Sequence, residues 1–568
     1  MELFVLLRRE TAILSKALIL FTIVSGVTNA LLLATINAAA ETVNKSEQNW
    51  EYLIMYMLCL GLLFFSQRYL LDKFSEMVES IVCGVRRRLV DKVRLTELAT
   101  MEKYGTSSIY ARITQDTSII SYTSAVLVMN IQQVVMILFA LCYVAIISIW
   151  SFFLVALGIG IIVLYHLEIA RSVSAMFKEA SKKETEYFEK LGGVFFGFKE
   201  VKINRRKNED VFNAYVEVNN ANRDQRIKTG KVYNKTLVLS QTLFYLILGA
   251  ILFVLPKLHP EHAIVITKVI ASVIFIIGPL TAVIFFIPRL TDASNSARNI
   301  IDLENQMEDE IKEMQGQKLE PYSPVNYRQL PFQDTIRLKE LSYQYPAGNS
   351  LVAGFSVGPI DLAIRKGELI FITGGNGSGK SSFLKLLTGL YAPQSGFIEL
   401  DGVNGRGLVV NSLNRQQYRN LFSIIFSDYY LYDKIYGVEG KIQPAAVNAL
   451  LENMGLPREK TVYENGAFTS IKLSSGQRKR LALAIAIFED KPIYVFDEVA
   501  ADLDPQFRDK FYFEILPELR ARNKTVLVVS HDQQYWNVSD RLIHFQDGSI
   551  RELSREEVYY LASMDNRG

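Results

Sequence analysis

The chain has 568 residues, which is too long for one compact core by usual domain sizes and predicts several domains. Hydrophobic residues make up 49% and charged residues 21%, so a disordered or fibrous chain is excluded and a membrane protein with a soluble part is favoured. The 62 basic and 59 acidic residues nearly cancel, and we therefore expect no nucleic acid partner.

Six apolar runs in the first half of the chain are long enough to cross a bilayer, which takes about 20 residues. They span residues 13–38, 51–71, 120–142, 144–167, 233–255 and 264–288. The first run follows Arg8 and Arg9 and ends in small residues near Ala40, a pattern that secretory signals share. It is longer than a signal core of about 7 to 15 residues, so a membrane span is the favoured interpretation.

Basic residues flank the spans unevenly. The segments between the second and third runs and between the fourth and fifth are rich in Lys and Arg, whereas the connections at 41–50 and 256–263 hold only Lys45 and Lys257. Because basic segments stay on the cytoplasmic side, both termini are predicted to be cytoplasmic. Residues 77–98 and 177–218 keep apolar residues at helical spacing, which predicts that the spanning helices continue beyond the bilayer.

A polar segment, 315–334, is interpreted as a linker between a membrane domain at 1–314 and a soluble domain at 335–568. An apolar strand then leads into Gly374-Gly-Asn-Gly-Ser-Gly-Lys-Ser381 and a helical pattern. This arrangement is typical of a phosphate-binding loop, whose backbone N–H groups surround phosphate oxygens, with Lys380 for the outer phosphates and Ser381 for Mg2+. The candidate nucleotide-binding residues here are Gly374, Asn376, Gly377, Ser378, Gly379, Lys380, Ser381 and Ser382.

Two further segments carry groups that suit a nucleotide site. The apolar strand 493–496 ends in Asp497 and Glu498, so one carboxylate can bind Mg2+ and the next can polarise an attacking water. Alone, such a pair is more often a solvated turn. Between the two motifs, Leu473-Ser-Ser-Gly-Gln477 precedes a helical pattern and predicts a helix N-terminus, which favours anions.

These motifs, in this order, give residues 336–552 a clear resemblance to the nucleotide-binding domain of ATP-binding cassette proteins. The resemblance implies ATP hydrolysis with Mg2+, a catalytic base at Glu498, a switch histidine at His531 and an aspartate loop at 501–504. It makes Lys380 catalytic, Asp497 a metal ligand and Tyr345 the aromatic that stacks on adenine, with Tyr343 as the competing choice. A plain strand aromatic stays open for Tyr345. The signature residues that the resemblance implies are Ser474, Ser475, Gly476 and Gln477.

One motif departs from the family pattern. The glutamine that touches Mg2+ and faces the membrane domain is replaced by Ser427, and Asp428 follows it. We expect Asp428 to act in its place through water, which makes Asp428 a further candidate metal ligand. The signature has Ser475 where the family more often has glycine. Neither change removes Lys380 or Glu498, so hydrolysis is still expected.

The membrane half resembles exporter-type cassette transporters, whose first and second cytoplasmic loops are similar to residues 101–116 and 191–204. The resemblance implies an α-helical membrane domain with six transmembrane helices fused to an α/β P-loop ATPase domain. One phosphate loop and one signature per chain imply a homodimer with two composite ATP sites. The implied location is a bacterial inner membrane, with the ATPase domain in the cytoplasm.

The sub-family that the chain resembles most is the cyclic-peptide and siderophore-precursor exporters, which implies a constrained peptide or peptide-derived siderophore or toxin as cargo. Export of lipids or multiple drugs, import of a siderophore or peptide by the same fold, and a non-transporting membrane regulator are the alternatives. Polar residues in the spans could line a pathway or bond between helices: Asn29, Asn37, Asn130, Gln133 and Gln241. Aromatic residues and prolines in the last span suit an adaptable cavity or a lipid-facing surface: Phe275, Phe285, Phe286, Pro279 and Pro288.

Overall fold

The computed structural model describes residues 2–10, 16–43, 50–258, 265–315, 330–345, 354–401, 407–438, 440 and 442–557. These residues form two compact units, Met1–Leu95 with Tyr104–Glu308 and Thr96–Lys103 with Asp309–Gly568. A short segment near residue 100 thus groups with the second unit although it lies between two spans in the sequence. Lys45 and residues 316–329 of the predicted linker lie outside the described residues.

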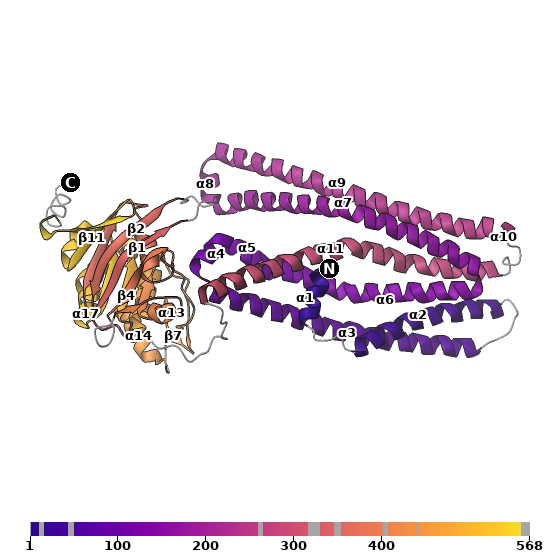
Figure 1. The fold of residues 1–568 in the computed structure, drawn as a ribbon, viewed down its shortest axis with the longest axis horizontal. Helices are drawn as coiled ribbons and strands as arrows, with labels where there is room; N and C mark the ends of the chain where they lie inside the picture. The colour runs from indigo at the N-terminus through magenta and orange to yellow at the C-terminus, as the bar shows by residue number, and fades with distance from the viewer. Residues whose placement is uncertain are drawn as a thin grey trace. The chain divides into compact units, whose positions relative to one another are not determined.

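The first unit is built from helices (Figure 1). They are α1 (Glu2–Glu10), α2 (Lys16–Val43), α3 (Trp50–Leu95), α5 (Thr106–Ala111), η1 (Arg112–Asp116), α6 (Thr117–Ile147), α7 (Ile149–Phe196), α8 (Phe198–Ile203), α9 (Arg205–Gly249), η2 (Ala250–Val254), α10 (Leu255–Leu258) and most of α11 (Ile266–Gln315).

Six helical segments in the described ranges are long and apolar enough to cross a bilayer, which confirms the six predicted spans. They are Ala17–Ala39, Trp50–Leu95, Ser108–Ile147, Ile149–His166, Arg205–Leu258 and Ile266–Lys312. Helices α3, α7 and α9 have 46, 48 and 45 residues, far more than the roughly 20 that a bilayer requires, so they continue beyond it as predicted.

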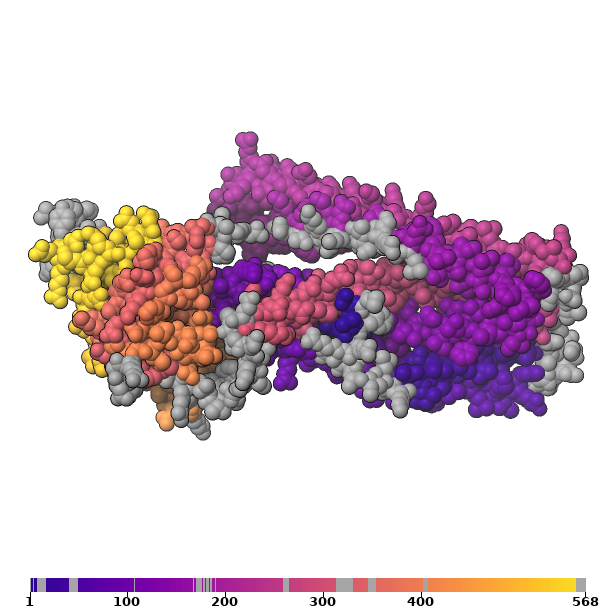
Figure 2. Space-filling model, in the orientation of Figure 1, coloured from indigo at the N-terminus to yellow at the C-terminus, as the bar shows by residue number. Residues whose placement is uncertain are grey.

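Long antiparallel contacts hold this unit together. Helix α7 packs along α9, and α2 packs against α3 and α6. Where the helices leave the apolar region, charged residues join α3 to α11: Arg88 Nε lies 2.7 Å from Oε1 of the fully buried Glu304, and Lys92 Nζ lies 2.9 Å from Glu308 Oε2. At the α8 end, the hairpin of α7 and α9 stands clear of the other helices of the unit (Figure 2).

Polar residues in the spans have two kinds of surroundings. The Asn37 amide donates to Ser272 Oγ at 3.2 Å, an interhelical bond that accounts for its burial. By contrast, Gln241 lines a pocket between α9 and α11 together with Ser240 and Thr281 among apolar side chains. Ser240 also lies 2.7 Å from His166 Nε2 of α7.

The last span contains both prolines inside one helix, Pro279 and Pro288. Its aromatic residues differ in exposure: Phe286 is buried, whereas Phe285 is about half exposed and its ring lies 5.8 Å from that of Tyr233.

The second unit contains two sheets (Figure 1). A four-stranded antiparallel sheet has the order β2-β1-β4-β5, formed by β2 (Ser356–Arg365), β1 (Thr335–Gln344), β4 (Ser395–Leu400) and β5 (Leu408–Val409). A six-stranded sheet has the order β12-β11-β3-β10-β9-β6, formed by β12 (Ser549–Leu553), β11 (Arg541–Gln546), β3 (Leu369–Gly374), β10 (Thr525–Val529), β9 (Ile493–Asp497) and β6 (Phe422–Ile425). Strands β3, β9 and β10 are buried along their whole length, as their apolar sequences require.

Helices and a short hairpin complete this unit. They are α4 (Leu98–Tyr104), α12 (Lys380–Leu387), α13 (Arg415–Arg419), α14 (Pro444–Asn453), β7 (Tyr463–Glu464), β8 (Ala467–Phe468), α15 (Ser475–Phe488), η5 (Val499–Asp502), α16 (Pro505–Lys510), η6 (Phe511–Ile515), α17 (Leu516–Ala521) and η7 (Gln533–Val538). Leu330 and Phe332, from the end of the predicted linker, are buried in the core between the two sheets.

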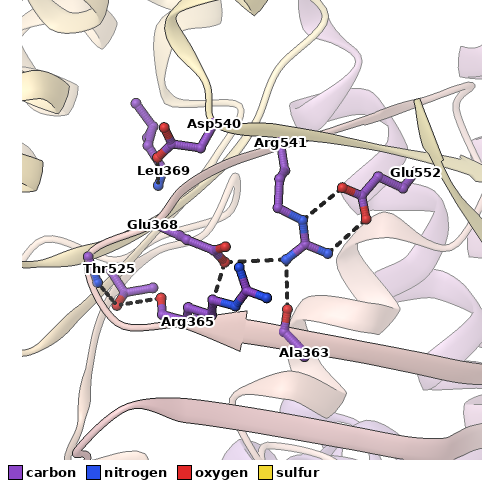
Figure 3. Close-up of polar contacts among 9 residues, drawn as sticks. Ala363, Arg365, Glu368, Leu369, Thr525, Asp540, Arg541 and Glu552 are labelled. Carbon is purple, nitrogen blue, oxygen red and sulfur yellow. Dashed lines mark hydrogen bonds and ion pairs between the residues drawn. The ribbon is translucent and has the colours of Figure 1, made fainter. Parts of the chain in front are cut away.

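A polar network joins the two sheets next to the start of β3 (Figure 3). The Arg541 guanidinium forms two bonds with the Glu552 carboxylate, at 2.9 and 2.8 Å, and also donates to the Ala363 carbonyl of β2 at 2.7 Å. Hydrogen bonding to Glu552 raises the pKa of Arg541, and the same contact lowers the pKa of Glu552. Arg541 Nη1 also lies 3.3 Å from Glu368 Oε2, and the Leu369 amide donates to the Asp540 carboxylate at 2.9 Å, so these contacts hold the start of the strand that leads into the phosphate loop.

Candidate active site

The phosphate loop adopts a backbone that requires glycine. Gly374 has a φ of 146°, and a Cβ there would lie 2.3 Å from the Phe545 carbonyl oxygen. Gly379 caps α12 with a φ of 106°. The buried strand β3 therefore leads into a tight loop. On this loop Asn376 and Gly377 are exposed, and Ser378 is buried.

The Lys380 side chain folds back over this loop. It is 6% exposed, and Nζ donates to the carbonyls of Gly374 at 2.8 Å and Gly375 at 3.0 Å. Burial lowers the pKa of Lys380, while the nearby Glu498 and Asp497 raise it. The buried Ser378 hydroxyl has no hydrogen-bond partner among the described residues, so the loop offers a polar group that a phosphate oxygen could satisfy.

Asp497, at the end of β9, is 2% exposed and lies beside Ser381, whose Oγ is 3.4 Å from Oδ2. Burial raises the pKa of Asp497, and hydrogen bonds from Ser427 and Ser381 oppose that shift. Ser427 is close enough to this carboxylate to influence its pKa, and both Ser427 and Asp428 are exposed to solvent. The residue at the glutamine position thus lies near the carboxylate that the sequence predicts as a metal ligand.

Glu498 has a left-handed backbone, with φ 53° and ψ 32°, which is uncommon outside glycine. Its amide donates to the Val529 carbonyl of β10 at 3.2 Å. Its carboxylate lies 3.3 Å from His531 Nε2, and both side chains are partly exposed. The structure therefore brings Lys380, Ser381, Asp497, Glu498 and His531 together at one edge of the six-stranded sheet.

The signature forms the start of α15. The Ser474 hydroxyl accepts from the Gln477 amide at 3.4 Å, and the Gln477 side chain accepts from the Ser474 amide at 3.2 Å, which is a capping box. Gly476 abuts the aspartate loop, because a Cβ there would lie 3.0 Å from the Asp502 carbonyl. Within the described part of the chain, no hydrogen bond or ion pair joins residues 474–477 to the phosphate loop.

Tyr345, the candidate adenine-binding residue, is half-buried, and its hydroxyl lies 2.9 Å from Ser382 Oγ of α12. Tyr343 is buried and stacks on Tyr391 with ring centroids 4.7 Å apart. Tyr343 is therefore a core residue, and Tyr345 is the aromatic placed beside the helix of the phosphate loop.

The segment around α4 makes a docking contact that no sequence motif indicated. The Glu102 carboxylate accepts from the Tyr391 hydroxyl and pairs with Lys385 of α12 at 2.9 Å. Glu97 pairs with Arg419 of α13 and lies 3.7 Å from Arg415 Nη1. Burial raises the pKa of Tyr391, and its bonds to Glu102 and Tyr345 add to that shift. The sequence feature that could have indicated this contact is a short helix with acidic residues between two long spans.

Two family models match this chain: residues 357–501 match the ABC transporter model and residues 16–283 match the ABC transporter transmembrane region. The ATP-binding protein SyrD of Pseudomonas syringae pv. syringae is 30% identical over 538 residues, 93% of this chain and 92% of that protein. The ATP-dependent lipid A-core flippase of Vibrio cholerae is 24% identical over 94% of this chain and 92% of its own length.

Among solved structures, a bacterial Atm1-family ABC exporter with ATP bound has a TM-score of 0.71 at 17% identity, covering 96% of both chains. The chain belongs to the ABC transporter family and has the exporter arrangement, with the membrane domain and the ATPase domain fused. It is an ATP hydrolase that couples nucleotide turnover to transport across the membrane that its helices span.

Proposed function

We propose that two copies of this chain form an exporter with two composite ATP sites. The observation that carries the proposal is that Gly476 of the signature lies against the aspartate loop of its own chain, while residues 474–477 make no bond to the phosphate loop among the described residues. The N-terminus of α15 favours an anion, and ATP held by the phosphate loop of a second copy would place its phosphate there. Two identical half-sites then close as a symmetric pair.

Exposed apolar residues at the tip around α8 support the proposal that a second copy binds. Four large apolar side chains there are exposed although the tip lies beyond the apolar part of the helices: Phe195, Phe196, Phe198 and Ile203, between 57% and 95% exposed. Contiguous apolar groups of this size on a soluble surface are unfavourable unless another surface covers them. The proposal assigns that cover to the second copy.

Within each site we assign roles by position. Lys380 and the backbone of the phosphate loop bind the phosphates, and Tyr345 packs on the adenine. Ser381 and Asp497 would hold Mg2+, whose chemistry is to neutralise charge on the transferred phosphoryl group. Glu498 accepts a proton from the attacking water, and His531 orients that carboxylate.

A cross-link tests the composite site. In a variant without the native cysteines, Ser378→Cys in one copy and Ser475→Cys in the other should form an intermolecular disulfide when ATP is bound and Glu498→Gln prevents turnover. Ser378→Cys paired with Thr469→Cys, a position at the far side of the signature loop, is the control. Cross-linking that is absent with ATP would refute the dimer of composite sites.

For the cargo, we propose an amphipathic, constrained peptide or a peptide-derived metabolite. The pocket between α9 and α11 combines Gln241, Ser240 and Thr281 with leucine, isoleucine and aromatic side chains, a lining that suits a ligand with both apolar and hydrogen-bonding groups. The names of relatives point to several cargo classes, including nisin for a transport protein of Lactococcus lactis and β-(1→2)glucan for an export protein of Bartonella bacilliformis. We also propose that the chain lies in a bacterial inner membrane, with its ATPase domain in the cytoplasm, because the basic segments between its spans favour the cytoplasmic side.

Stimulation of ATP hydrolysis separates these cargo classes. The purified protein in lipid is tested with cyclic peptides, linear peptides of the same composition, lipid A-type lipids and hydrophobic dyes. We expect stimulation by cyclic peptides, with Gln241→Leu weakening it and Gln133→Leu as the matched control on another helix. Stimulation by lipid or dye alone would overturn the peptide assignment and favour a lipid or multidrug exporter.

A further inference from the structure

Lys479 is a buried lysine in the second turn of α15, directly after the signature. Its side chain is 8% exposed, and it contacts two different loops. Nζ donates to the Glu498 carbonyl at 2.9 Å and pairs with Asp502 Oδ2 at 3.0 Å. A buried ammonium with one carbonyl and one carboxylate partner is a specific arrangement, since each partner compensates for the lost hydration.

The residue that Lys479 holds is the proposed catalytic base. Glu498 has a left-handed backbone that a non-glycine residue adopts only where its surroundings fix it. On one side its amide bonds to β10, and on the other its carbonyl accepts from Lys479. The direction of the Glu498 side chain therefore depends on where Lys479, and with it the start of α15, lies.

We propose that Lys479 is a positioning residue that couples the two ATP sites of the dimer. The inference rests on the proposed composite sites: the signature of one chain binds the ATP held by its partner, while Glu498 of the same chain acts on the ATP of its own phosphate loop. Lys479 joins those two elements through one side chain. When the signature turn shifts as nucleotide binds or leaves, the contact of Lys479 with the Glu498 carbonyl shifts with it, and so does its contact with Asp502. The position of Glu498 at the other ATP site therefore changes.

The chain contains a matched control for this contact. Lys524 is also mostly buried, donates to the Asp490 carbonyl at 3.1 Å and pairs with Asp490 Oδ1 at 2.8 Å. Asp490 has a φ of 49°, so this lysine likewise supports a left-handed non-glycine residue. This contact lies at the other end of α15, away from Glu498, so it has no link to the proposed base.

The test compares Lys479→Met and Lys479→Arg with Lys524→Met in the full-length protein in lipid, measuring kcat, KM for ATP and the Hill coefficient. Lys479→Met should lower kcat by about 10- to 100-fold with little change in KM and bring the Hill coefficient toward 1, because the base loses its alignment. Lys479→Arg, which keeps a donor and the charge, should recover part of kcat. Lys524→Met should stay within about twofold of the unaltered protein.

Three results would overturn the inference. One is unchanged cooperativity in Lys479→Met. Another is an equal loss of kcat in Lys524→Met, which would mean a general effect on stability, and thermal unfolding of both variants measures that effect directly. The third is failure of the 378–475 cross-link when Lys479 is unchanged, which removes the composite sites and the inference together. If the cross-link forms and the Hill coefficient is unchanged in Lys479→Met, the proposed dimer stands and only the role of Lys479 is rejected.

Discussion

His531 Nε2 lies 3.3 Å from Glu498 Oε1, and the two residues come from loops that follow neighbouring parallel strands, β10 and β9. The pairing orients the carboxylate without covering it, since both side chains remain partly exposed. A base that is held by a neighbour and open to water has the arrangement needed to take a proton from an attacking water.

Glu498→Gln should therefore bind ATP with near-normal affinity and hydrolyse it about 100-fold more slowly or worse, because the amide cannot accept the proton. The measurement is nucleotide binding by fluorescence together with phosphate release under the same conditions. Hydrolysis at the unaltered rate would show that Glu498 is not the base.

Lys380→Ala should weaken binding itself. Its ammonium is held at the loop by two carbonyls and supplies the charge for the outer phosphates, so its loss should lower ATP affinity by about 10- to 100-fold. Titration with ATP at fixed Mg2+ measures this affinity. Lys385→Met, one turn further along α12, is the control, and an equal loss there would contradict the assignment.

Ser427→Ala should raise the Mg2+ concentration needed for half-maximal turnover, because Ser427 is among the groups that favour the charged form of the Asp497 carboxylate. The sequence favoured Asp428 for this role, but Ser427, and not Asp428, is among the groups that shift the pKa of Asp497. Asp428→Ala should therefore have the smaller effect on Mg2+ dependence. A larger effect of Asp428→Ala would restore the interpretation based on the sequence.

Glu97→Gln should reduce substrate movement per ATP while leaving basal hydrolysis within about twofold, since it removes the carboxylate that pairs with Arg419 and Arg415 but touches no nucleotide-binding residue. Glu452→Gln is the control, because its partner Arg458 is exposed and the pair contributes little. Unchanged coupling in Glu97→Gln would mean that the α4 segment docks without transmitting movement.

Single cysteines test the orientation. After removal of Cys59, Cys83 and Cys142, an impermeant thiol reagent should reach cysteines at positions 46 and 259 from outside, but not at 205, where the arginine side chain is 95% exposed. External labelling at 205 would reverse the predicted topology.

The sequence predicted the parts of this structure that depend on local pattern. Six spans follow from apolar length, and the phosphate loop from glycines at fixed spacing between a strand and a helix. The contacts that join these parts could not be predicted, because they connect distant positions: Glu102 and Tyr391 are 289 residues apart. Ser427 and Lys479 likewise have no motif that reports their partners, since a serine or lysine in such segments is usually solvated.

The central claim is that ATP turnover in this chain drives export, and transport into inside-out vesicles tests it most directly. Vesicles containing the protein receive a labelled cyclic peptide on the outside, with ATP or with a non-hydrolysable analogue, alongside vesicles with Glu498→Gln. We expect accumulation inside only with ATP and the unaltered protein. Hydrolysis of ATP with no movement of any cargo in the panel, or movement from the lumen outward, would contradict it.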